Sequence, residues 1–148
     1  MSKKDRPKFK FRDVDQLRRN RDIERDGTLL GVGPVTFLVR AATDENPAWK
    51  QFGDEFRNNV RRLARANASE ERTKEFLAEN FVKIFILDWP TAPIDDASGE
   101  SVPFSREACV EFLMQTDDAI PLIQAMVYDT QYFRGDRIEG VVEQVKNS

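Results

Sequence analysis

One stretch of the chain gathers side chains that could hold a metal ion. Carboxylates and a hydroxyl come close together in Asp88, Asp95, Asp96, Ser98 and Glu100. Calcium prefers oxygen ligands of this kind, but a calcium loop needs them at alternating positions, with a central glycine and a closing glutamate. The segment lacks that order, so we interpret it as a solvated acidic turn and predict no metal site.

The sequence also lacks the residue patterns of phosphate-binding and catalytic sites. Gly31 and Gly33 form a pair without the lysine or the following helix of a phosphate-binding loop. Asp117 and Asp118 are better explained as helix caps. The sequence contains no histidine, which removes Ser/His/Asp and Cys/His catalysis, histidine metal ligation and the usual general base near neutral pH. We therefore predict no catalytic residue, no cofactor and no enzyme activity.

The composition indicates one soluble globular domain. Of the 148 residues, 40% are hydrophobic and 33% are charged, and the net charge is −3. No uninterrupted apolar run is longer than Ile84 to Leu87, far short of a membrane span, and the N-terminus lacks the apolar region of a secretory signal. The single cysteine, Cys109, fits a reducing cytosol. We expect a cytoplasmic protein without a membrane partner.

Residues 1–27 differ from the rest of the chain. They carry ten basic and six acidic side chains and few large apolar ones, so this segment alone cannot bury enough apolar surface to offset the entropy of ordering it. We interpret it as a charged, partly flexible N-terminal arm with a short helix near Asp13 to Asn20. The interleaved acids make a nucleic-acid partner unlikely, because arms that bind nucleic acid concentrate like charge.

Residues 28–42 contain two short runs rich in β-branched and aromatic residues. Gly33 and Pro34 separate the runs, which predicts a β-hairpin. A hairpin alone is marginally stable in water, so it must pack on helices or pair with another sheet. Its free edges are a natural place for self-association, which we expect.

From Asp44 onward the apolar spacing becomes helical, and residues 28–148 are predicted to form a single helical domain with the hairpin at 28–42. Asn46 and Pro47 suit a helix start. The apolar stripe that follows consists of Trp49, Phe52, Phe56, Val60 and Leu63. Arginines every fourth residue on this helix could pair with glutamates on the next, although two independently solvated faces explain them equally well.

The second helix is predicted to start after a Ser69 cap and to stop at Trp89 and Pro90. A turn-rich connection follows, and Ser105 caps the next helix. A further helix begins near Asp118, and a short last helix is predicted over 138–145. The predicted fold class is therefore mainly α, a compact multi-helix domain with one N-terminal β-hairpin.

The segment from Leu87 to Arg134 carries a distinctive order of features. It reads Leu87-Asp88-Trp89-Pro90, an acidic turn with Gly99, Val102-Pro103-Phe104-Ser105-Arg106-Glu107, an apolar helical pattern and Tyr132-Phe133-Arg134. This order resembles the tail assembly chaperones of long-tailed bacteriophages, closely over about a third of the chain and elsewhere by length and general pattern. The basic residues of the N-terminal arm match no motif of that family.

The resemblance implies a non-catalytic protein of the host bacterial cytoplasm that binds and solubilises the tape measure protein during tail morphogenesis. It further implies a tail tube protein as partner of a longer form made by ribosomal frameshifting. The residues that we assign to partner binding border the turn-rich connection: Trp89, Phe104, Ile123, Met126 and Phe133. Ordinary core packing is the alternative interpretation of the same residues.

Two other functions fit the same sequence. A structural tail-completion or connector component retained in the virion would use the same helices and hairpin in a fixed ring. A nucleic-acid-binding adaptor would use the basic arm, and its binding would depend steeply on salt.

Overall fold

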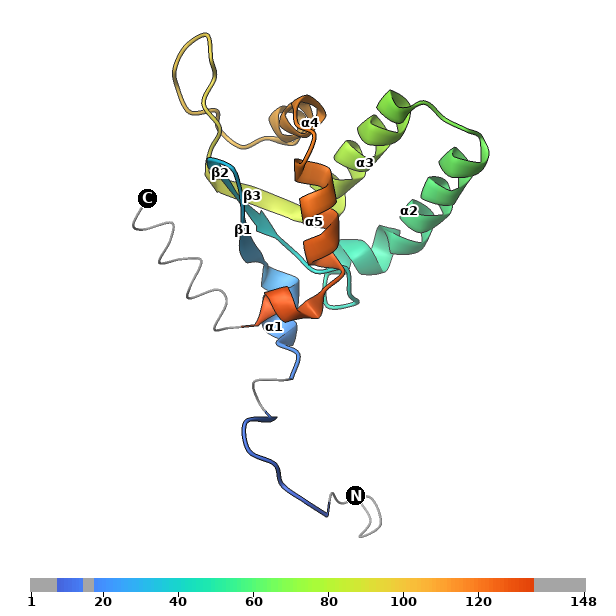
Figure 1. Cartoon of the computed structure of the whole chain (residues 1–148), viewed down its shortest axis with the longest axis vertical. Coiled ribbons are helices and arrows are strands. Elements are labelled where there is room, and N and C mark those ends of the chain that lie inside the picture. Colours follow the sequence, from blue (N-terminus) through green and yellow to red (C-terminus); the bar gives the residue numbers. More distant parts are fainter. Residues whose placement is uncertain (1–7, 15–17, 135–148) are drawn as a thin grey trace.

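The fold is mixed α/β, with helices packed around a small antiparallel sheet (Figure 1). The computed structural model describes residues 8–14 and 18–134. In chain order the elements are α1 (Arg21–Asp26), β1 (Thr28–Val32), β2 (Val35–Val39), α2 (Pro47–Arg65), α3 (Glu70–Ile84), β3 (Ile86–Thr91), α4 (Arg106–Gln115), α5 (Ala119–Val127) and the 3-10 helix η3 (Thr130–Phe133). The last helix predicted over 138–145 lies outside the described residues.

The predicted hairpin is confirmed, and its two strands belong to a sheet of three strands. Strands β1 and β2 pair antiparallel from Thr28 with Val39 to Val32 with Val35. Gly33 adopts a positive φ of 56° in the two-residue turn between them, a conformation that glycine adopts without steric cost. The sheet order is β1-β2-β3, so β2 is the central strand.

The third strand corrects the prediction of a mainly α fold. Helix α3 ends at Ile84 and does not continue to Trp89 and Pro90; Phe85 is its C-cap and the next six residues form β3. The physical reason is a strand pairing between residues that are far apart in the sequence. The edge of β2 that faces away from β1 needs hydrogen-bonding partners, and β3 supplies them antiparallel with irregular register. Local helical spacing up to Phe85 gave no sign of this pairing.

Two residues of the predicted apolar stripe on α2, Trp49 and Phe56, are buried in the core together with rings from the end of α3. The rings of Trp49, Phe56, Phe81 and Phe85 pack together with centroids 5.3–6.5 Å apart. Gly53 permits this packing, since a Cβ there would come within 2.9 Å of the Trp49 ring.

Other apolar residues at helical spacing, which such spacing predicts to be buried, are only partly buried. They are Phe52, Val60, Leu63, Leu77 and Phe112. The first four lie on α2 and α3, whose connected ends project beyond the sheet in Figure 1. The charge pairing considered between these two helices is absent: across 47–84 no salt bridge links α2 to α3, and Arg57 instead pairs with Asp54 on its own helix.

The end of the charged N-terminal segment is built into the fold. The helix begins at Arg21, after an Asn20 cap, which is later than the sequence indicates. The carboxylate of Glu24 is fully buried and accepts hydrogen bonds from Arg19, at 3.0 and 2.5 Å, and from Thr43 at 2.9 Å. The backbone carbonyl of Glu24 also accepts from the amide of Ala41 at 3.1 Å. Helix α1 is thereby fixed to the loop that leads into α2.

No helix among the described residues is long and apolar enough to cross a membrane.

Candidate functional site

The side chains considered for chemistry do not assemble into a reactive site. Within 8–14 and 18–134, no group of three or more histidine, cysteine or acidic residues could hold a metal ion. Asp95 accepts hydrogen bonds from the Ser98 hydroxyl and amide, which lower the pKa of its carboxyl and close the acidic turn. Cys109 is fully buried, and burial raises the pKa of its thiol to about 12, so it is a poor nucleophile at neutral pH.

The five residues assigned to partner binding lie mostly in the core. Trp89, Ile123, Met126 and Phe133 are each at most 4% exposed, whereas Phe104 is half-buried. Phe104 packs its edge on the Trp89 ring at a centroid distance of 5.4 Å, and Trp89 donates from Nε1 to the carbonyl of Val102 at 3.0 Å. In this conformation Phe104 is the most accessible of the five, and hollows elsewhere in the described part of the chain offer further accessible surface.

Hollows lie along α3, and one of them opens between α2, α3 and α5. We call it the aromatic groove; it has a volume of about 250 Å³ and is lined by Phe56, Arg57, Val60, Arg61, Leu77, Phe81, Gln124 and Tyr128. Its floor consists of core rings, and its wall includes Tyr128, which is 49% exposed. Burial is the main cause that raises the pKa of Tyr128, and the charge of Arg57 opposes it.

The two cations that line the aromatic groove, Arg57 and Arg61, both belong to α2. The guanidinium of Arg57 lies over the Trp49 ring, 5.1 Å from its centroid. Arg57 and Arg61 are one helical turn apart, so both line the same groove. The groove therefore combines exposed apolar surface with a positive rim.

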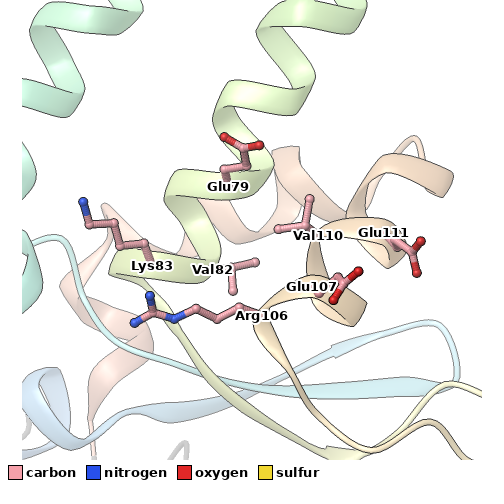
Figure 2. Close-up of a pocket in the computed structure, with 7 residues that line it drawn as sticks. All are labelled: Glu79, Val82, Lys83, Arg106, Glu107, Val110 and Glu111. Carbon is pink, nitrogen blue, oxygen red and sulfur yellow. The ribbon is translucent and has the colours of Figure 1, made fainter.

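Another hollow opens between α3 and α4, and we call it the acidic groove (Figure 2). It has a volume of about 480 Å³. Val82 and Val110 lie between the two helices. Around them stand three carboxylates, Glu79, Glu107 and Glu111, and two cations, Lys83 and Arg106, that extend to the opposite side. Lys83 also lies over the ring of Phe52, 3.7 Å from its centroid.

Buried and exposed caps position the helices that form these grooves. Asn46 is fully buried; its Oδ1 accepts from the amides of Ala48 and Trp49, and its Nδ2 donates to the carbonyls of Ala41 and Ile84 at 3.0 Å each. One side chain thus joins the end of β2, the start of α2 and the end of α3.

Helix α4 is held differently. Ser105, which is exposed, accepts from the amide of Ala108 at 3.0 Å and starts the helix, as predicted. Near its other end, Lys74 of α3 donates to the carbonyl of Thr116 at 2.5 Å.

Sequence reasoning missed both grooves. The predicted apolar stripe includes Phe56, which lies in the core. Spacing alone does not show that its ring and that of Phe81 also form the floor of a hollow. Val110 and the glutamates beside it gave no usable signal, because a single apolar residue on a helix surface is normal in soluble proteins.

The fold and these hollows define a small mixed α/β domain with two apolar grooves of opposite rim charge. The chain belongs to the family described as YdaY prophage protein, whose model matches residues 44–144. The matched region starts before α2 and includes every residue that lines the two grooves. The chain is therefore phage-derived. No match was found among curated proteins or among solved structures.

Proposed function

We propose that this protein is a phage tail assembly chaperone that binds and solubilises the tape measure protein during tail morphogenesis. The observation that carries the proposal is the ordered segment from Leu87 to Arg134, which resembles such chaperones and lies inside the region matched by a prophage family. In the fold this segment supplies most of β3 and all of α4 and α5. Helix α4 forms one wall of the acidic groove, and Gln124 of α5 and Tyr128 after it line the aromatic groove.

The aromatic groove is the surface that best fits such a client. A long, helical, apolar protein aggregates unless its apolar faces are covered. An amphipathic helix binds by placing apolar side chains in a hydrophobic groove, and Val60, Leu77 and Tyr128 offer partly exposed apolar surface for this. The rim arginines favour a client segment that flanks its apolar residues with acids. Many copies on one client allow weak contacts to suffice.

Co-expression with the tape measure protein of the same prophage tests the proposal. The wild-type chain is expected to raise the soluble fraction of the client, and purified virions are expected to lack the chain by mass spectrometry. If the client stays insoluble, or if virions contain the chain at stoichiometric level, the chaperone function is wrong. The second of these results favours the structural tail-completion or connector component.

A matched pair of variants tests the groove. Arg57→Glu with Arg61→Glu reverses the charge of the rim and is expected to lower client solubility. Lys50→Glu with Arg65→Glu makes the same charge change on exposed residues of α2 outside both grooves. The control variant should keep the wild-type melting temperature, since surface substitutions usually change stability by only about 0.5 kcal/mol. The rim variant also loses the contact of Arg57 with Trp49 and its pair with Asp54, so client solubility is compared at a temperature at which circular dichroism shows both variants folded. Equal loss of client solubility in the two variants would place the client elsewhere.

A further inference from the structure

The described part of the N-terminal segment exposes aromatic side chains. Phe9 is 65% exposed and Phe11 is 71% exposed, in an alternating run with Lys8, Lys10 and Arg12. Their rings lie 6.1 Å apart, and Lys8 lies over the Phe9 ring at 5.9 Å. Together the two rings form a small exposed apolar patch, which is surface that a partner of complementary charge could bury. We call residues 8–12 the aromatic arm.

The aromatic arm does not reach the acidic groove of its own molecule. In Figure 1 it extends beyond α1, at the opposite end of the molecule from α4. The arm also lies outside residues 44–144, whereas the acidic groove lies inside them. An occupant of the groove that comes from this segment must therefore belong to a second copy.

The acidic groove and the aromatic arm are complementary in charge. No salt bridge in the described part of the chain involves Glu79, Glu107 or Glu111, and none there involves the three cations of the arm. Three unpaired carboxylates thus surround an apolar floor of valines, and three unpaired cations alternate with two apolar rings.

The spacing of the cations along the arm is close to the spacing of two carboxylates in the groove. Alternate residues of an extended segment lie about 6.5–7 Å apart on one face. Glu107 and Glu111 are one helical turn apart on α4, which separates their Cβ atoms by about 5–6 Å. Successive side chains of an extended segment point to opposite faces, so the rings of the arm can face Val82 and Val110 while its cations lie on the outer face. The long side chains of two successive cations can then bend back to the carboxylates of Glu107 and Glu111 at the rim. Asp13 follows the cations directly and matches the opposite, cationic side of the groove.

We propose that the aromatic arm of one copy binds in the acidic groove of a second copy, so that copies associate arm to groove. The contact uses different surfaces on the two partners, so it is heterologous and allows more than two copies to join. This contact does not depend on the identity of the client, and its test needs no client.

Charge reversal on each side tests the contact in the full-length protein. An arm variant carries Lys8→Glu, Lys10→Glu and Arg12→Glu, and a groove variant carries Glu107→Lys and Glu111→Lys. Sedimentation velocity should show oligomers for the wild type that dissociate as salt rises, and monomers for each variant alone. Association should weaken on the order of tenfold or more, because several exposed charge pairs are lost together. Circular dichroism and melting temperature show that each variant is folded.

Mixing the two variants gives the decisive result. In the mixture the native arm of the groove variant meets the native groove of the arm variant, and the reversed arm meets the reversed groove, so oligomers in which the two variants alternate are expected. A chain that carries both reversals should associate again, because an acidic arm then meets a basic groove. As an apolar test, Phe9→Ala with Phe11→Ala should also give monomers at low salt.

Four results would overturn the proposal. A wild type that is monomeric at every concentration has no such contact. An arm variant or a groove variant that still associates uses another surface, of which the free edge of β1 is the first to test. Mixed variants that stay monomeric show that the two surfaces do not bind each other. If the variant with Phe9→Ala and Phe11→Ala associates as strongly as the wild type, the two rings are not buried in the contact.

Discussion

The aromatic groove and the acidic groove share α3 but differ in what lies beneath them. Phe56 and Phe81 form the floor of the first groove, and both are core residues that are 5% and 1% exposed. The second rests on Val82, which is buried, and Val110, which is half-buried. The floor of the aromatic groove therefore cannot change without loss of stability, whereas the rim charges of either groove can. For the two contacts proposed above, the rims are therefore expected to set partner choice and the floors to set stability.

The helices opposite α3 are also anchored differently. Helix α2 starts at Asn46, a buried side chain with four hydrogen bonds, and its preceding loop is tied to the buried Glu24. Helix α4 starts at Ser105, which is exposed and makes one capping bond. The aromatic groove should thus be rigidly placed and sensitive to substitution, and the acidic groove more tolerant.

The largest effect is expected from Asn46→Ala. The change removes an N-cap and the Nδ2 donor to the carbonyls of Ala41 and Ile84, of which the Ile84 carbonyl still accepts from Arg40 at 3.3 Å. Together these losses should lower the free energy of unfolding by about 2–3 kcal/mol. Urea unfolding measures this loss. Client solubilisation should fall with it, because α2 loses its position relative to α3. A midpoint equal to that of the wild type would show that the buried network does not anchor the aromatic groove.

A smaller, pH-dependent effect is expected from Glu24→Gln. Burial alone would raise the pKa of Glu24, but hydrogen bonds from Arg19 and Thr43 and the charge of Arg19 hold it below its ordinary value. A depressed pKa stabilises the folded state above the ordinary value near 4.5, and this contribution is lost as the pH falls through the folded-state pKa.

At pH 7 the variant should lose about 1–3 kcal/mol of stability, because a charged buried acceptor with three hydrogen bonds is replaced by a neutral one. Melting curves from pH 7 to pH 3 should show the difference between wild type and variant narrowing below about pH 4.5. A difference that stays constant over this range would mean that Glu24 is not ionised in the folded protein.

The smallest effect is expected from Ser105→Ala, which removes the cap of α4. The loss of stability should be about 1 kcal/mol, seen as a shifted urea midpoint. Since α4 carries Glu107 and Glu111, self-association should weaken more than client solubilisation does. Ser105→Asp is the matched control, because aspartate also caps helices and should restore stability. If Ser105→Ala impairs client solubilisation as strongly as Asn46→Ala, the two grooves are not anchored independently.

Much of the fold could be predicted from local patterns. Asn46, Ser69 and Ser105 all cap helices as predicted, because a cap is a local hydrogen bond between a side chain and the next turn. Strand β3 could not be predicted in this way. Its partner β2 lies some fifty residues earlier in the chain, and the pairing that it completes leaves no periodic trace in its own six residues.

The candidate site could be predicted less well. Apolar residues near the 92–105 connection were assigned to a partner because the connection is turn-rich, yet Ile123 and Phe133 face the core. Helical spacing identifies an apolar face but not whether another element of the same chain covers it. The rim charges were visible in the sequence, but only the packing of α2 and α4 on α3 shows which of them surround an apolar floor.

The sheet order has a consequence for synthesis of the protein. The hairpin of β1 and β2 leaves the ribosome well before β3, and at about 5–20 residues per second the intervening fifty residues take about 3–10 s. During that time β2 presents a bare edge of hydrophobic, β-branched residues, and a two-stranded hairpin is only marginally stable in water. Helices α2 and α3 depend on local contacts and can fold within this interval. The newly made chain is thus most open to wrong strand pairing just before Thr91 emerges, and crowded synthesis of many copies would make that interval the main source of aggregation.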